Sequence, residues 1–199
     1  ALSISAVTII IAFLGPVLGN IADNKGMKKI FFTTVVSVGV ICCVINGFTT
    51  SWLLFLLLYI VTRICYNAAN AIYDSMLNDI TSEERMDEVS SYGYAWGYIG
   101  SCIPFLVALI AYVLGPDMVG IISASLSKQI GCIVTALWWA IVTLPLLKNY
   151  EQLFYTEKKE HAIRNSFKEI GHTLKTIALK DKKVLYFLIA FFFYIDGVG

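Results

Sequence analysis

Long stretches without a single charged side chain are the feature that most constrains this chain. Residues 1–22, 30–62, 89–116 and 129–147 contain no Lys, Arg, Asp, Glu or His. A stretch of about 18 or more apolar residues with few charges is a candidate transmembrane helix. Of the 199 residues, 58% are hydrophobic and 15% are charged, whereas soluble domains are about 25% charged. The composition therefore argues against a soluble enzyme, a nucleic-acid-binding module and a disordered chain.

The sequence predicts an all-α fold, a polytopic bundle of transmembrane helices. The expected spans are residues 2–19, 30–49, 52–77, 90–114, 128–147 and 184–199. Residues 118–127 are apolar with interspersed serines, and two alternatives stay open for them: an outward extension of the fifth span or a separate loop helix. Because apolar segments occupy both ends of the chain, we expect a piece of a longer membrane protein.

Basic residues indicate which ends of the spans face the cytoplasm. Loops 20–29, 78–89 and 148–183 hold every Lys and Arg except Arg63 and Lys128. Alternating spans place all three loops on one side, which the positive-inside rule identifies as cytoplasmic. In the third loop, apolar residues recur at helical spacing between charged ones, which predicts an amphipathic helix. This helix is expected to pack as a linker between two membrane halves, to lie on the anionic lipid surface, or both.

The cytoplasmic loop after the first span carries the pattern G-x-x-x-D-x-x-G-x-K-K. Its members are Gly19, Asp23, Gly26, Lys28 and Lys29. Gly19 permits close helix approach, Asp23 can accept bonds from helix N-terminal amides or pair with a cation, and Gly26 permits a turn with positive φ. The two lysines are expected to anchor the next helix at the interface. The pattern resembles the loop 2–3 signature of the major facilitator superfamily, which implies a cytoplasmic gating loop.

A stripe of polar side chains runs along one face of the third expected span. Its members, at spacing i, i+4, i+7 and i+11, are Arg63, Asn67, Asn70 and Asp74. An arginine near mid-membrane costs about 2.5–3.5 kcal/mol on insertion scales, so this face is expected to line the bundle interior or a water-filled cavity. Tyr66 and Tyr73 flank the stripe. We interpret the stripe with Tyr73 as a candidate substrate or proton path, in which Arg63 can bind a carboxylate; the alternative is a polar cluster that ties helices together.

A second acidic side chain falls inside the last expected span. That span enters from the cytoplasm near residue 184. Asp196 would therefore lie about 18 Å along the helix from that entry point, by helix rise. It is a further candidate for the substrate or proton path and a candidate partner for Arg63.

Small residues and one proline mark the fourth expected span. Gly93, Gly97 and Gly100 form a small-residue face, and such a pattern lets membrane helices pack closely. Pro104 follows one turn later and can bend the helix. Tight packing alone would explain these residues, whereas a bend at a moving interface would make them part of a transport mechanism.

Several stretches resemble the vacuole-effluxer-like branch of the major facilitator superfamily, which includes a yeast autophagy-related vacuolar amino-acid effluxer and bacterial relatives. The matching stretches include VSSYGYAWGYIG and YIDGV, and they cover residues 3–23, 73–80, 84–85, 89–100, 137–139, 144–146 and 191–198. The resemblance implies a twelve-helix transporter of which this chain holds about helices 2–7. Residues 1–147 would then belong to the N-terminal half without its first helix, residues 148–183 would form the cytoplasmic linker, and residues 184–199 would begin the C-terminal half.

The resemblance also implies a secondary active transporter that moves a small solute by alternating access. Amino acids are the substrate class suggested by the yeast relative, with a proton as the candidate coupling ion; sugars, other metabolites or drugs are the alternative within the superfamily. A second alternative is a membrane sensor or scaffold with this fold and no transport. The expected partners are the lipid bilayer and a small-molecule substrate, without nucleic acid, and the oligomeric state stays open.

We find no catalytic motif that would indicate an enzyme. The five cysteines all lie in apolar segments and form neither a metal-ligand nor a disulfide pattern. We therefore expect no enzyme activity, cofactor or metal. The expected location is an integral, multi-pass one in the plasma membrane of a bacterium, which we favour, or in the vacuolar membrane of a fungus.

Overall fold

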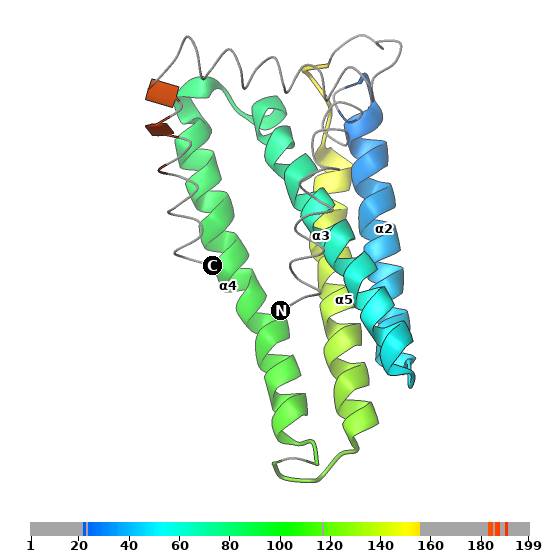
Figure 1. Ribbon diagram of the computed structural model, residues 1–199. Coiled ribbons are helices and arrows are strands. Elements are labelled where there is room, and N and C mark those ends of the chain that lie inside the picture. Colours follow the sequence, from blue (N-terminus) through cyan, green and yellow to red (C-terminus); the bar gives the residue numbers. More distant parts are fainter. Residues whose placement is uncertain are drawn as a thin grey trace. The chain divides into compact units, whose positions relative to one another are not determined.

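The computed structural model describes residues 22, 24–116, 118–155, 183–184, 186–187 and 190 of the chain. Within them, four long α-helices follow one another (Figure 1). They are α2 (Met27–Phe48), α3 (Trp52–Ile80), α4 (Met86–Val113) and α5 (Ala124–Asn149), with a short 3-10 helix η1 (Glu83–Arg85) before α4. Each of the four is long and apolar enough to cross a membrane. The predicted all-α membrane bundle is confirmed for this part of the chain.

The helix bounds agree with four of the six expected spans to within about four residues. For example, α3 begins at Trp52 as predicted and continues to Ile80, three residues further than expected. The span expected at 2–19, most of the one at 184–199 and the amphipathic helix expected in 148–183 lie outside the described residues. The chain separates into two compact units, Ala1–Lys158 and Lys159–Gly199, and the four long helices belong to the first.

A glycine turn starts α2. Gly26 has φ 72° and ψ 0°, the left-handed conformation that glycine adopts without a steric penalty. The amide of Met27 donates to the carbonyl oxygen of Asn24 at 3.0 Å and closes the turn. The predicted positive φ at Gly26 is therefore confirmed.

The connection from α3 to α4 differs from the expected one. The T-x-x-E sequence of Thr81 and Glu84 predicts a capping box at the start of the next helix. In the structure Thr81 instead ends α3 in an extended conformation, with its amide donating to Leu77. The chain then passes through η1 directly into α4, and no side chain caps either helix. The capping box is wrong because the Thr81 backbone is already committed to closing α3.

The connection from α4 to α5 decides part of the open question about residues 118–127. Residues 124–127 form the first turn of α5, whereas residues 118–123 form turns and bends. Ser123 caps α5, since its hydroxyl accepts a hydrogen bond from the Leu126 amide at 3.2 Å. A serine at this position satisfies one of the amides that a helix start leaves unpaired. The extension of the fifth span is therefore one turn long.

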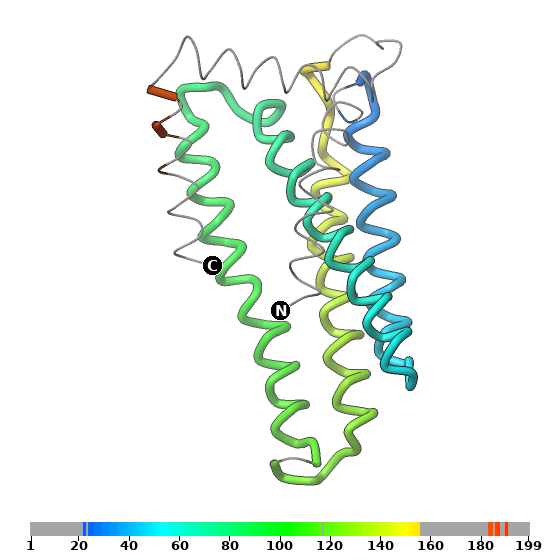
Figure 2. The backbone as a smooth tube through the Cα atoms, in the orientation of Figure 1, coloured from blue at the N-terminus to red at the C-terminus, as the bar shows by residue number. Residues whose placement is uncertain are grey.

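The packed core lies between α2, α3 and α5. Helix α2 packs on both α3 and α5, and α4 packs on α5 while scarcely touching α3 (Figure 2). Phe32 and Val36 of α2 contact Ile72 and Met76 of α3, and Ile72 and Met76 have at most 2% of their surface exposed. Tyr150, just after α5, completes this cluster. The core lies toward the end of the bundle where loop 20–29 begins α2.

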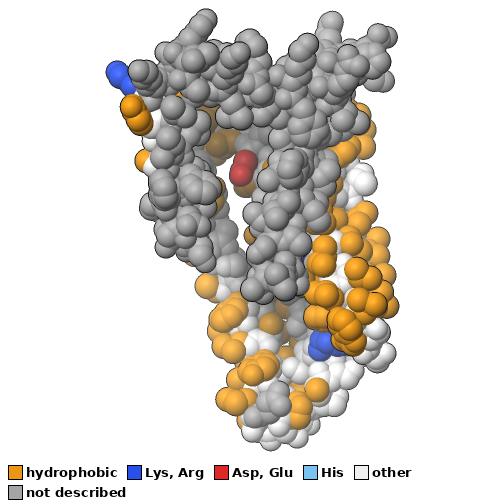
Figure 3. All heavy atoms as spheres, in the orientation of Figure 1, with side chains coloured by type: hydrophobic (Ala, Val, Ile, Leu, Met, Phe, Trp, Pro, Cys, Tyr) orange, Lys and Arg blue, Asp and Glu red, His pale blue; other side chains and the backbone are white. Residues whose placement is uncertain are grey.

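Most of the remaining apolar surface is uncovered. Between 6% and 33% of each apolar helix window is buried inside the described part, with α4 the least covered. Figure 3 shows apolar side chains over much of the described area of one face. A soluble protein does not leave large apolar side chains exposed to water in such number. These helices are therefore surrounded by lipid or by further helices.

Candidate functional site

Helix α3 has a packed face and a polar face. The packed face carries the buried residues Cys65, Ala68, Ala69, Ile72, Met76 and Asp79. At 3.6 residues per turn, positions 63, 67, 70 and 74 fall about half a turn away from that row. Arg63 and Asn67 are partly buried, whereas Asn70, Tyr73 and Asp74 are exposed. The structure therefore keeps the polar stripe together, on the side of α3 that points away from its packing partners.

The surroundings of this polar face follow from its chemistry. A charged guanidinium and two carboxamides would be strongly disfavoured against lipid tails, so intramembrane polar residues face a bundle interior or a water-filled cavity. Asn67 satisfies one of its donors locally, through a 2.9 Å hydrogen bond from Nδ2 to the carbonyl oxygen of Arg63. The exposed Asn70 and Asp74 make no such bond among the described residues. This face is available to contact a solute, water or another segment of the protein.

Among the described residues, Arg63 lies beside one aromatic ring. Its Cζ atom is 5.9 Å from the centre of the Tyr66 ring. Its Nε atom is buried and has no hydrogen-bond partner among the described residues. The predicted partner Asp196 lies outside the described residues, so the pairing stays a prediction.

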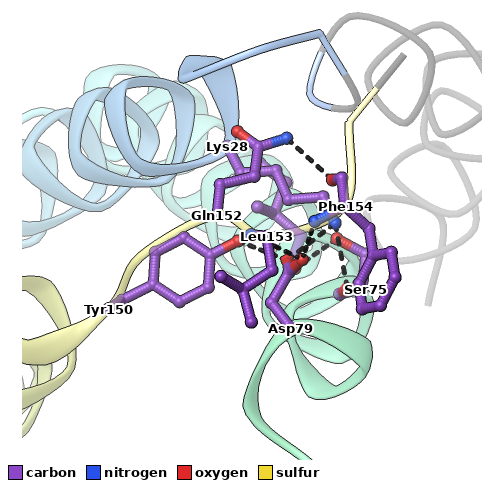
Figure 4. A network of polar contacts seen from close by, with 8 residues as sticks. Lys28, Ser75, Asp79, Tyr150, Gln152, Leu153 and Phe154 are labelled. Atoms are coloured by element: carbon purple, nitrogen blue, oxygen red, sulfur yellow. Dashed lines mark hydrogen bonds and ion pairs between the residues drawn. The ribbon is translucent and has the colours of Figure 1, made fainter.

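A buried polar cluster lies at the predicted cytoplasmic end of the bundle (Figure 4). We call it the Asp79 cluster; it consists of Lys28, Ser75, Asp79, Tyr150, Leu153 and Phe154. The Asp79 Oδ2 atom accepts from Lys28 Nζ at 3.0 Å and from the Tyr150 hydroxyl at 2.6 Å. Its Oδ1 atom accepts from the amides of Leu153 at 3.1 Å and Phe154 at 2.8 Å. Lys28 Nζ also donates to the carbonyl oxygen of Ser75 at 3.2 Å.

The Asp79 cluster joins three parts of the chain. The Lys28 and Asp79 side chains are 5% and 0% exposed, so their charges are almost completely removed from water. A buried ion pair is tolerated when further hydrogen bonds satisfy its remaining atoms, and here four donors converge on one carboxylate. As a result α2, α3 and the segment after α5 are held together at one point.

The predicted gating loop is described only in part. Gly19 and Asp23 lie outside the described residues, so their roles stay predictions. Lys28 differs from the expected interfacial anchor, because it is 4% exposed and pairs with Asp79. Lys29 is exposed, and its Nζ atom donates to the carbonyl oxygen of Tyr150 at 3.4 Å.

Sequence reasoning missed Asp79 and Tyr150. Asp79 was assigned to a loop, although its spacing of three from Met76 and seven from Ile72 places it on the apolar, packed face of α3. A lone acid in register with a row of buried apolar residues was the available signal. Tyr150 offered no comparable signal, since its partner lies 71 residues earlier.

The glycine face of α4 makes few contacts with the described helices. A methyl group added at Gly97 would meet nothing within 4 Å, at Gly93 only the Tyr73 hydroxyl at 3.7 Å, and at Gly100 only Trp138 at 3.9 Å. Helix α4 continues through Pro104 as one element. Close packing at these glycines stays a prediction for segments beyond the described ones.

Potential metal ligands do not gather in the described part of the chain. All five cysteines are free thiols, and the described residues contain no group of three or more His, Cys, Asp or Glu side chains arranged to hold a metal. The polar face of α3 and the Asp79 cluster are thus the two candidate functional regions of the described part.

Comparison with known proteins decides the family. The family model described as "Vacuole effluxer Atg22 like" matches residues 1–199, the whole chain. The chain belongs to the Atg22-like vacuole effluxer family. This confirms the resemblance noted in the sequence.

Two relatives extend this result. The Atg22-like chain is 43% identical over 199 residues to an uncharacterized MFS-type transporter, YxiO, of Bacillus subtilis (strain 168), an alignment that covers 99% of the chain and 46% of the relative. It is 24% identical over 187 residues to a class H tetracycline resistance protein of Pasteurella multocida, covering 92% of the chain and 42% of the relative. No solved structure matches significantly.

These matches define what is shown about the Atg22-like chain. It is an integral membrane chain of the major facilitator type, and the relative of that type is named as a transporter. The chain spans less than half of the length of each of these relatives.

Proposed function

We propose that the protein is a secondary active transporter that moves a small solute by alternating access, with amino acids as the leading substrate class. The observation that carries the proposal is the polar face of α3, which places Arg63, Asn67, Asn70 and Asp74 opposite the packed core. Transporters of this general kind bind their substrate near the bilayer midplane, between two halves that rock against each other. A polar face directed away from its own half is what such a binding site requires.

The second element of the proposal is a coupling proton. Asp74 is an exposed carboxyl group on the polar face of α3. Intramembrane acidic residues mark proton relays in pumps and transporters. We assign Asp74 and Asp196 as the candidate proton sites, and a bacterial plasma membrane, which would supply a proton gradient, is the location that the Bacillus relative favours.

The test is solute flux in proteoliposomes that contain the full-length protein. Uptake of labelled amino acids is measured with and without a pH gradient, and unlabelled sugars and tetracycline are added as competitors to compare the other substrate classes. Arg63→Ala should reduce flux by about tenfold or more, by loss of a charged hydrogen bond to the solute. The matched control is Arg85→Ala, because the Arg85 side chain is 67% exposed at the end of η1, outside the four long helices.

The outcomes separate the alternatives. Flux that rises with an imposed pH gradient and falls in Asp74→Asn supports proton coupling. Flux unchanged in Arg63→Ala would remove Arg63 from the mechanism. An absence of flux for every solute tested, together with a protein partner bound through segment 148–183, would favour a sensor or scaffold instead.

A further inference from the structure

Arg63 is connected to two neighbouring helices through aromatic side chains. Helix α3 contributes Arg63 and Tyr66, α5 contributes Trp139 and α2 contributes Gly39. We call these four residues the Arg63 site. All belong to the first compact unit of the chain.

The Trp139 ring of this site packs against Gly39 of α2. A Cβ atom at Gly39 would lie 2.6 Å and 2.7 Å from two ring carbons of Trp139 and 3.0 Å from the Cβ atom of Cys65. Real Cβ atoms essentially never come within 3.0 Å of another atom, so an alanine here would require the Trp139 ring to shift. Trp139 meets Tyr66 edge-on, with ring centres 6.1 Å apart and planes at 71°. This is a favourable arrangement of two aromatic rings.

The Tyr66 ring in turn contacts the guanidinium of Arg63. The Arg63 Cζ atom lies 5.9 Å from the centre of the Tyr66 ring, within the range of a cation–π interaction. A row of contacts therefore runs from Gly39 through Trp139 and Tyr66 to the guanidinium. None of these contacts neutralises its charge.

The charge of Arg63 has no described counterpart. Its Nε atom is buried without a hydrogen-bond partner among the described residues, and burying a donor without an acceptor is costly. Arginine stays charged in proteins, so a missing partner has to be an acceptor. The other basic residues of the four described helices all lie within five residues of a helix end: Lys28, Lys29, Lys128 and Lys148.

We propose that Arg63 binds one carboxylate group of the transported solute, and that Gly39, Trp139 and Tyr66 are positioning residues that hold the guanidinium for it. The inference rests on the proposed transport function and specifies its substrate class. The planar guanidinium matches a carboxylate through two parallel hydrogen bonds. A single positive charge also matches a monoanion, whereas a dianionic phosphate group would leave a negative charge uncompensated in a medium of low dielectric.

The first experiment measures equilibrium binding to the detergent-purified full-length protein, as a ligand-induced shift of thermal unfolding. The probes are acetate, isovalerate, L-leucine and L-phenylalanine, each paired with its amide. At least one carboxylate should bind about tenfold or more tightly than its amide, since a hydrogen bond to a charged group is lost. Arg63→Gln should abolish that preference. Binding of no carboxylate, or equal binding of carboxylates and amides, would overturn the proposal.

The second experiment tests the positioning residues. Gly39→Ala should weaken carboxylate binding while leaving the affinity for the amide unchanged, because it displaces Trp139. Gly131→Ala is the matched control, since a methyl group there meets nothing within 4 Å. If Gly39→Ala fails to fold, Gly39→Ala combined with Trp139→Phe makes room for the methyl group, and Tyr66→Leu alone removes the ring beside Arg63. Unchanged preference for carboxylates in Tyr66→Leu would overturn the positioning role.

Two further outcomes distinguish this inference from its alternatives. If Asp196 is the partner of Arg63 instead, Arg63→Gln should destabilise the protein, and adding Asp196→Asn to that variant should restore its stability. In that case no variant and no wild-type protein should bind a carboxylate. Carboxylate binding through Arg63 without any flux would overturn the transport function and leave the binding site standing. If the protein transports solute but Arg63→Gln leaves carboxylate binding unchanged, the binding site at Arg63 is overturned and the transport function stands.

Discussion

The carboxylate of Asp79 receives hydrogen bonds from donors that come from separate parts of the chain. Two donors, Lys28 and Tyr150, meet one oxygen, and two backbone amides meet the other. Bonds to an ionised acceptor are about twice as strong as those between neutral groups. The side chain therefore contributes to stability as a fixed junction rather than as a surface ion pair.

Asp79→Asn is expected to lower the free energy of unfolding by about 3 kcal/mol or more, as for one partner of a buried ion pair. The amide group keeps one acceptor but turns the other into a donor that faces the Lys28 ammonium and the Tyr150 hydroxyl. The measurement is denaturant unfolding of the full-length protein in detergent. Glu88→Gln is the control, because its ion pair with Arg85 is exposed and such pairs contribute about 0–1 kcal/mol. Equal effects of the two variants would contradict a structural role for the cluster.

Prediction from the sequence succeeded for single residues where the signal was local. Gly26 was expected in a turn with positive φ and has φ 72°, because glycine alone removes the steric cost. The Lys28–Asp79 pair was not found, because the two residues are 51 positions apart and only the packing of α2 on α3 brings them together. The same applies to Trp139 on Gly39, where a ring of α5 fills a space on α2.

The helices themselves were largely predictable, because each apolar run is long enough to cross a membrane and is bounded by polar residues. The spans follow from the lack of charges, and α3 starts at the expected residue. Helix ends were less predictable, because a short motif does not determine where the previous helix ends. The Thr81 amide donates to Leu77 in the last turn of α3, so the expected capping box does not form. The polar stripe was placed on one face of α3 by spacing alone, but its position opposite the core required the structure.

Asn70→Cys, in a cysteine-free background, should react with a hydrophilic, charged thiol reagent. Asn70 lies on the polar face of α3, which is expected to line a water-filled path. Leu57→Cys on the same helix is the control, because Leu57 is 52% exposed but lies in an apolar stretch that we expect to face lipid. The measurement is the labelling rate in membranes. Equal rates at both positions would contradict an aqueous polar face.

Ser123→Ala should lower the free energy of unfolding by about 1 kcal/mol, the usual cost of losing a helix cap. The Ser123 hydroxyl is the side-chain acceptor at the start of α5. Ser82→Ala should change it little, because the Ser82 side chain makes no capping bond. Thermal unfolding of both variants in detergent compares them, and an equal loss would contradict capping by Ser123.

The four described helices bury one shared core and leave other helix faces without contacts to described residues. Helices α2, α3 and α5 share a core, while the polar face of α3 and most of α4 remain uncovered. An intramembrane arginine faces a protein interior or a water-filled cavity, so we expect the polar face of α3 to line one of these. This agrees with a chain that spans 46% of a transporter-type relative.

The orientation of the whole bundle is tested by labelling its loops. Met118→Cys, between α4 and α5, should react with a membrane-impermeant thiol reagent on intact cells, since that loop is expected outside. Lys25→Cys, in the basic loop before α2, should react only after the membrane is permeabilised. Both side chains are exposed in the structure. The reverse result would invert the topology and place the Asp79 cluster on the outer side.

The sparse contacts of α4 have a consequence for how the bundle is synthesised. Helix α4 packs on α5 and hardly at all on α3, and α5 emerges from the ribosome after it. Because synthesis proceeds from the N-terminus, the α2–α3 hairpin can close before α5 is made, whereas α4 gains its main contact among the described helices only when α5 follows. The arrival of α5 then completes two contacts at once, with α2 on one side and α4 on the other. Among the described helices, α5 is therefore the one whose synthesis joins the α2–α3 hairpin to α4.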